Sequence, residues 1–119
     1  MDTKLTNYRR IIKQVLTSYL ELINRSTSTN STSTNEENDV VFDEERDHYF
    51  VQTIGWDKTG RVSETTIYVR LRHSKFWIEI DWTEHGIAND LLVAGVPKDD
   101  IVLAFHHPDL RPLTEFAVA

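Results

Sequence analysis

A cluster of charged residues within FDEERDHYFVQTIGWD, residues 42–57, is the first candidate for chemistry. Four carboxylates lie within residues 43–47, directly before His48. General acid–base catalysis needs two such groups held in different environments. Side chains that follow one another along a strand alternate between its faces, so these carboxylates do not converge on one substrate atom. The pattern therefore favours a charged, solvated start of a strand, with Arg46 paired to a neighbour, over an active site.

A second candidate is a rim where a strand is expected to end and a helix to begin. Strand ends hold side chains rigidly at the edge of a sheet, which suits a functional site. Asp81, Glu84 and His85 lie there, and His107 would join them if the C-terminal segment folds back. A metal ion would need a third or fourth ligand from the C-terminal segment, and the spacing of these residues matches no defined metal-binding motif. The alternative is that Asp81 and Glu84 accept hydrogen bonds at the start of the helix, with no metal or other cofactor.

A third candidate is a strip of interleaved basic and aromatic side chains on an expected hairpin. Its members are Arg61, Tyr68, Arg70, Arg72, Lys75 and Trp77. Such a strip can stack nucleobases and contact phosphates. It can equally anchor a protein partner, since Trp, Tyr and Arg dominate such contacts. The remaining alternative is a solvated sheet face on which an arginine pairs with Glu79 across strands.

The composition limits these possibilities. The 119 residues carry a net charge of −6 and include no cysteine. The absence of cysteine excludes disulfides, thiolate zinc sites and a cysteine nucleophile. An acidic total argues against a general polyphosphate-binding surface, so any DNA contact would be local or made through a partner. No signal peptide and no apolar run near the roughly 20 residues of a membrane span is present, and we expect a soluble, cytoplasmic protein.

The first part of the chain predicts a helix and a loop. Residues 4–23 carry apolar side chains at spacings of three and four, which places them on one helical stripe. The members of this stripe are Leu5, Tyr8, Ile12, Val15, Tyr19 and Ile23. Residues 26–38 contain only Ser, Thr, Asn and Glu, and a segment without apolar side chains cannot offset its ordering entropy by burial. We therefore expect a flexible loop at 26–38 within a single domain spanning residues 1–119.

From Val40 onward the hydrophobic period is two, which is typical of strands. After a turn at 57–60, Ile67, Val69 and Leu71 alternate with polar or aromatic residues. The next strand alternates Phe76, Ile78, Ile80 and Trp82 against Trp77, Glu79 and Asp81. Short turns between such strands predict an antiparallel meander.

The last third of the chain returns to a helical pattern. Thr83 is the expected N-cap of a short helix that ends at Gly95, before Pro97. The run Ile101–Phe105 is too short to distinguish a buried strand from a helix, and an irregular segment follows it. The fold class is therefore α+β, with an N-terminal amphipathic helix, an antiparallel β-meander, then a short helix and a C-terminal segment packed on the sheet.

Several ordered blocks of the sequence resemble the XisI family. They are YRRIIKQVL, FDEERDHYFVQTIGW, KFWIEIDWTEHGIANDLL and GVPKDDIVLAFHHPDLRPLTEFAVA. These blocks and the spacing between them extend the resemblance along nearly the whole chain outside the Ser/Thr/Asn stretch. The family is described as fdxN element excision controlling factors of cyanobacteria, which act with a partner, XisH, and a site-specific recombinase, XisF, during heterocyst development. The resemblance assigns no catalytic role to any residue.

The resemblance implies a non-enzymatic regulatory protein that binds a XisH-like partner and affects DNA rearrangement indirectly. Two alternatives stay open: a direct DNA-binding module, and a metal-dependent enzyme built on the rim of Asp81, Glu84, His85 and His107. The open sheet edges and many aromatic residues also predict a homo-oligomer, most simply a dimer.

Overall fold

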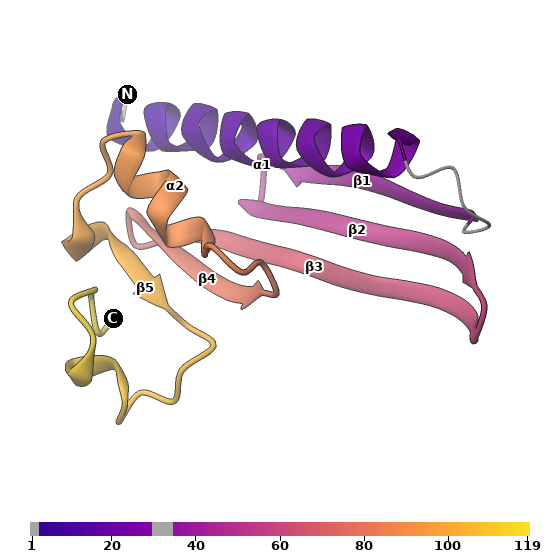
Figure 1. Cartoon of the computed structure of the whole chain (residues 1–119). Coiled ribbons are helices and arrows are strands. Elements are labelled where there is room, and N and C mark those ends of the chain that lie inside the picture. Colours follow the sequence, from indigo (N-terminus) through magenta and orange to yellow (C-terminus); the bar gives the residue numbers. More distant parts are fainter. Residues whose placement is uncertain (1–2, 30–34) are drawn as a thin grey trace.

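The computed structural model describes residues 3–29 and 35–119 as an α+β fold, which confirms the expected fold class (Figure 1). The elements in chain order are α1 (Thr3–Thr29), β1 (Asn35–Asp43), β2 (His48–Asp57), β3 (Gly60–Arg72), β4 (Lys75–Asp81), α2 (Ile87–Val93) and β5 (Ile101–Leu103). Two short 3-10 turns, Lys98–Asp100 and Arg111–Leu113, precede and follow β5. Over the described residues, no helix is both long and apolar enough to cross a membrane.

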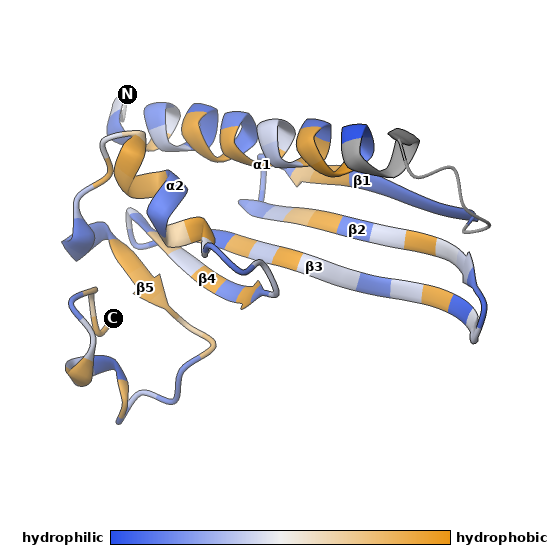
Figure 2. Ribbon diagram, in the orientation of Figure 1, coloured by the Kyte–Doolittle hydropathy of each residue, from blue (hydrophilic) through white to orange (hydrophobic). Residues whose placement is uncertain are grey.

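Helix α1 lies along one face of the sheet and buries its apolar stripe there. Ile12 and Leu16 are completely buried, in one cluster with Tyr49 and Val51 of β2. Figure 2 shows the hydrophobic residues of α1 on the side toward the sheet and hydrophilic residues on the opposite side. Burial of this stripe supplies most of the stability of such a helix, because helix propensity alone is weak in water.

The ends of the expected loop at 26–38 are part of regular structure, so its predicted boundaries are wrong. The backbone of residues 26–29 continues α1, and residues 35–38 belong to β1, which pairs with β2 as far as Asn35 opposite Trp56. Each residue added to a formed helix or ladder gains backbone hydrogen bonds, which a count of apolar side chains overlooks. Residues 30–34 lie outside the described residues.

The sheet has the order β1-β2-β3-β4-β5. The first four strands pair antiparallel as consecutive neighbours, which confirms the predicted meander. Strand β5 pairs parallel to β4, and α2 makes the crossover that a parallel neighbour requires. The run from Ile101 to Leu103, left open by the sequence, is therefore a strand.

Two irregularities in pairing change which side chains share a face. Thr66 has no partner on β2, because Val51 pairs with Ile67 and Gln52 with Thr65. Glu79 has no partner on β3, because Val69 pairs with Ile78 and Tyr68 with Ile80. Paired residues point to the same side of a sheet, and an extra residue shifts every later residue to the other face.

The irregularity at Glu79 corrects the predicted alternation of β4. Phe76 and Ile78 face the helices, as expected, but Ile80 lies with Tyr68 on the opposite face. Asp81 pairs with Ile67 and therefore faces the helices. Trp82, expected to lie on the core side, is 79% exposed.

The C-terminal segment packs on the β5 end of the sheet, as predicted (Figure 1). Ala117 pairs with Val102, and its N–H donates to the Ile101 carbonyl at 2.9 Å. The Arg111 guanidinium lies 5.8 Å from the centre of the Trp77 ring. This segment therefore covers the edge of β5 and part of the sheet face opposite the helices.

An ion pair between Arg9 of α1 and Asp47 fixes the helix to the sheet. Arg9 donates to both oxygens of the Asp47 carboxylate, at 2.8 and 3.0 Å, and the Tyr49 hydroxyl donates to the same carboxylate at 2.8 Å. Burial alone would raise the pKa of Asp47, but the hydrogen bonds from Arg9 and Tyr49 outweigh it and hold that pKa below its ordinary value. The acidic stretch at 42–57 thus contains a structural clamp.

A second contact of the same kind holds the first turns of α1 to the β5 end of the molecule. The Tyr8 hydroxyl donates to Asp100 at 2.5 Å, and the Lys4 ammonium lies 2.9 Å from the same carboxylate. Burial and the Asp100 hydrogen bond raise the pKa of Tyr8. With both contacts in place, the position of α1 along the sheet is determined.

The clamp predicts an acid-sensitive loss of stability. Asp47→Asn should lower the free energy of unfolding at pH 7 by about 1–3 kcal/mol, because it removes a charge from a partly buried hydrogen-bonded pair. The change leaves the backbone unstrained, since Asp47 has φ 61° and Asn accepts this conformation. A carboxyl whose pKa folding lowers stabilises the folded state above its unfolded-state pKa and ceases to do so as the pH falls through the folded value.

Urea denaturation at pH 7 and at pH 3 measures the effect. The difference between the wild type and Asp47→Asn should be large at pH 7 and should shrink at pH 3. Glu45→Gln, an exposed change in the same turn, is the matched control and should stay within about 0.5 kcal/mol of the wild type. Equal losses in the two variants would contradict the assignment of the clamp.

Candidate functional site

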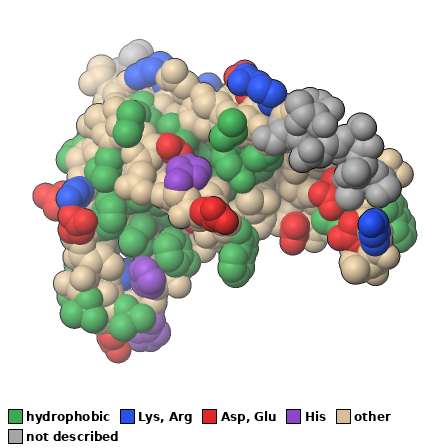
Figure 3. Space-filling view, in the orientation of Figure 1, with side chains coloured by type: hydrophobic (Ala, Val, Ile, Leu, Met, Phe, Trp, Pro, Cys, Tyr) green, Lys and Arg blue, Asp and Glu red, His purple; other side chains and the backbone are tan. Residues whose placement is uncertain are grey.

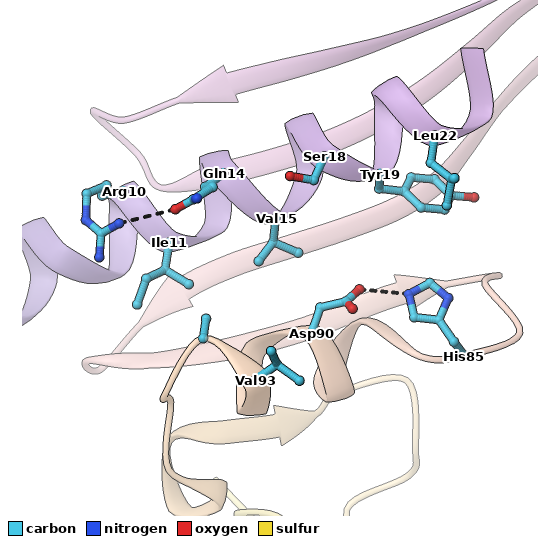
Figure 4. A pocket seen from close by; sticks show the side chains of 11 residues that line it. Arg10, Ile11, Gln14, Val15, Ser18, Tyr19, Leu22, His85, Asp90 and Val93 are labelled. Carbon is cyan, nitrogen blue, oxygen red and sulfur yellow. Dashed lines mark hydrogen bonds and ion pairs between the residues drawn. The ribbon is translucent and has the colours of Figure 1, made fainter. Parts of the chain in front are cut away.

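A hollow of about 460 Å³ lies between α1 and α2. Its lining comes from one side of α1 and from α2 with the turn before it, namely Arg10, Ile11, Gln14, Val15, Ser18, Tyr19, Leu22, His85, Asp90, Val93 and Ala94. Figure 4 shows the side chains of the two helices facing each other across it, and Figure 3 shows hydrophobic side chains gathered over α2 and the adjoining part of α1. Leu22 is 56% exposed and Val93 is 89% exposed. We call this hollow the interhelical groove.

One end of the interhelical groove carries a histidine–carboxylate pair. His85 Nε2 lies 2.7 Å from Asp90 Oδ2, and both side chains are partly exposed. The Tyr19 ring lies 6.3 Å from the His85 ring. Burial, with a smaller contribution from the nearby Asp81 carboxylate, raises the pKa of the Tyr19 hydroxyl, which keeps it protonated near neutral pH.

Asp81 positions His85 through the backbone. One Asp81 oxygen accepts from the N–H and the hydroxyl of Thr83 at 2.9 and 2.6 Å, and the other accepts from the Ile87 N–H at 2.8 Å. Asp81 therefore satisfies the start of α2, as one of the sequence alternatives held. The residue at the N-cap position is Gly86, at φ 81°, and not Thr83 as predicted. The Thr83 hydroxyl accepts from the Gly86 N–H at 3.1 Å.

The predicted rim of Asp81, Glu84, His85 and His107 is divided in the structure. Asp81 accepts hydrogen bonds from the backbone N–H groups of Thr83 and Ile87. Glu84 is exposed, and His85 faces the interhelical groove. His107 lies in the C-terminal segment, where its Nδ1 accepts from the Asp109 N–H at 3.1 Å. Within the described residues there is no group of three or more His, Cys, Asp or Glu side chains that could hold a metal ion.

The basic and aromatic strip lies on the sheet face opposite the helices, but most of its charges have partners within the chain. Arg70 donates to Glu79 at 3.0 Å, as the cross-strand alternative proposed. Arg72 lies 5.3 Å from the Trp77 ring centre, and the indole N–H donates to the Arg72 carbonyl at 2.9 Å. The Lys75 ammonium donates to the Ala119 carbonyl at 2.5 Å.

Two members of the strip, Tyr68 and Arg61, lie farther along β3 from the turn between β3 and β4. The Tyr68 hydroxyl is 2.7 Å from His48 Nδ1, and its ring stacks on Phe50 with centres 4.3 Å apart. Arg61 lies at the opposite end of β3, where its guanidinium is 5.5 Å from the Trp56 ring. A strand rises about 3.3 Å per residue, so Arg61 and Arg72 cannot contact one compact ligand together.

The sequence did not identify Leu22, Asp90 and Val93 as site residues. The sequence pattern could have identified two of them. Leu22 lies beside the buried stripe of α1, and Val93 is an exposed apolar residue at the end of α2. Their proximity depends on how α2 packs beside α1, which no local pattern encodes. The groove combines an apolar surface with two polar pairs, Arg10–Gln14 and His85–Asp90, the composition of a protein-docking patch.

Comparison with known proteins gives matches over nearly the whole chain. The family model described as XisI protein matches residues 1–118. The chain is similar to the crystal structure of fdxN element excision controlling factor XisI from Anabaena variabilis, with 40% identity, a TM-score of 0.78, and coverage of 98% of this chain and 99% of that one. It is also similar to a XisI-like protein from the same organism, with 30% identity, a TM-score of 0.81, and coverage of 97% and 99%. No protein of curated function matches it.

The role of Asp81 as the support of the groove is testable. Asp81→Ala should lower the free energy of unfolding by about 1–3 kcal/mol, because the N–H groups of Thr83 and Ile87 lose their acceptor. Glu84→Ala, three residues away and exposed, is the matched control and should change it by less than about 0.5 kcal/mol. Urea denaturation measures the free energy of unfolding of both variants, and similar values would contradict the supporting role of Asp81.

Proposed function

This chain belongs to the XisI family, and from that premise we propose that it is an accessory factor that controls excision of a DNA element. The observation that carries this proposal is the 40% identity, over 98% of the chain, to a protein named as an fdxN element excision controlling factor. The factor acts in the cytoplasm and without catalysis of its own, through a XisH-like protein and a site-specific recombinase.

The use of the carboxylates supports a non-enzymatic role. Asp47 is held by Arg9 and Tyr49, and both oxygens of Asp81 accept hydrogen bonds from the start of α2. Catalysis needs acids and bases that converge on a reacting group. Asp47 and Asp81, two of the carboxylates that the sequence nominated, instead hold the fold together.

We assign the contact with the XisH-like protein to the interhelical groove. Leu22 and Val93 are exposed apolar side chains at its edge, and apolar groups of this kind form the centre of protein interfaces. The His85–Asp90 pair at one end supplies polar groups that fix the register of a bound segment. An amphipathic helix of the partner fits such a groove, with apolar anchors at helical spacing.

Direct binding of DNA by the strip has less support. Arg70 is neutralised by Glu79, and Arg72 and Arg111 both lie over Trp77. Affinity for DNA comes from cations that are available to phosphates and falls steeply with salt. Because these arginines already contact Glu79 or Trp77, few cations on this face are available to phosphates.

Co-expression with the XisH-like protein tests the proposal. The two proteins should co-elute in size-exclusion chromatography at a fixed ratio. Val93→Glu should weaken the complex at least about tenfold, because it places a charge in the apolar part of the interface. Since Val93 is 89% exposed in the free protein, the substitution should leave folding intact.

The matched control is Leu113→Glu, at a position 83% exposed but on the C-terminal segment. This variant should bind like the wild type. Separate elution of the two wild-type proteins would exclude the XisH-like protein as the partner. Co-elution that Val93→Glu leaves unchanged would keep the partner and reject the groove.

A further inference from the structure

Among residues 3–29 and 35–119, no helix or loop packs on the face of β1, β2 and β3 opposite the helices. Both helices pack on the other face, and the C-terminal segment reaches only the β4 and β5 end (Figure 1). Along β2 the buried residues Tyr49, Val51 and Thr53 alternate with partly exposed or exposed ones. We call the side of β1–β3 away from the helices the open face.

Large apolar side chains lie on the open face. Along its centre on β2, Ile54 is 47% exposed and Trp56 is 56% exposed, and Val41 of β1, opposite Phe50, is 49% exposed. Phe50 stacks on Tyr68. The polar row of Asp39, Gln52 and Thr65 separates the pair Val41 and Phe50 from Ile54 and Trp56. Large exposed apolar side chains gathered on one face in this way mark an interaction site.

The charges on the open face are segregated by strand. Glu37 and Asp39 of β1 are exposed and pair with Ile54 and Gln52, which places both carboxylates on this face. Arg61 of β3 pairs with Trp56 and is exposed on the same face. The apolar centre on β2 therefore lies between a strand with exposed carboxylates and a strand with an exposed arginine, whose guanidinium lies over Trp56.

We propose that the open face is covered by the open face of a second copy of this chain, in a symmetric sheet-on-sheet dimer. A twofold axis between two facing sheets can run along the strands or across them. An axis across the strands would place β1 on β1 and bring acidic side chains together. An axis along β2 places β1 of one copy over β3 of the other, so that Glu37, level with Ser63, approaches Arg61 at two symmetry-related places.

The same axis accounts for the apolar centre. Ile54, Trp56 and Phe50 lie on the strand that the axis follows, so each faces its equivalent in the other copy. Two twisted sheets pack in this way about 10 Å apart, with their strands inclined by about 30°. This geometry does not depend on the excision role, and it leaves the interhelical groove of each copy exposed on the outside of the dimer.

A second copy fits the open face better than a nucleic acid does. A phosphate backbone lying over β3 would also approach the carboxylates of Glu37 and Asp39 on β1, and like charges repel. The dimer uses both signs of charge.

The mass in solution tests the proposal first. Light scattering after size exclusion should give twice the chain mass of 13.9 kDa for the wild type. Ile54→Asp should raise the dissociation constant of the dimer at least about tenfold, because it places two carboxylates at the centre of the interface. Val93→Glu, an exposed change on the opposite side of the molecule, is the control and should leave the dimer intact. Circular dichroism should show both variants folded.

Charge reversal tests the direction of the axis. Arg61→Glu should weaken the dimer several-fold, and adding Glu37→Arg to it should restore most of the loss, because the two residues meet across the axis. A monomeric wild type, or a dimer that Ile54→Asp leaves unchanged, would overturn the proposal. A monomer that binds duplex DNA through Arg61, with a steep salt dependence, would assign the open face to nucleic acid instead.

Discussion

The packing of α1 across one face of the sheet is the constraint on which the rest of the structure depends. A helix of 27 residues buries Ile12 and Leu16 against the central strands, and the Arg9–Asp47 pair fixes its position. Helix α2 has only seven residues and lies beside α1 on the same face. Because α2 is short, the two helices leave the groove between them, and because both lie on one side, the other side of β1–β3 is open.

Both proposed surfaces follow from this one-sided arrangement. The groove is formed by side chains at the edges of two helices, such as Leu22 and Val93, that remain exposed. The open face is formed by the outward residues of strands whose inward residues make the core. In the described part of the chain, the groove and the open face lie on opposite sides of the sheet.

The spacing of apolar residues predicted the fold class, because a period of two or of three to four shows which side chains of a strand or helix are buried. Ile67, Val69 and Leu71 alternate as expected, and the stripe of α1 is where the sequence placed it. The extra residues Thr66 and Glu79 were not foreseen, since one unpaired residue leaves no mark on composition. Each changes which side chains share a face. Because of the extra residue Thr66, Arg61 and Tyr68 lie on one face although they are seven residues apart, and because of the extra residue Glu79, Asp81 faces the helices. The groove was missed for a related reason, because it depends on the placement of α2 beside α1.

In the proposed dimer, the two interhelical grooves lie apart on the outer sides, where each can bind one XisH-like protein. The most direct test is the mass of the purified complex with the XisH-like protein, measured by light scattering together with its subunit ratio. The complex should contain two copies of this chain and one partner molecule for each copy. A complex with a single copy of this chain would contradict the proposed dimer.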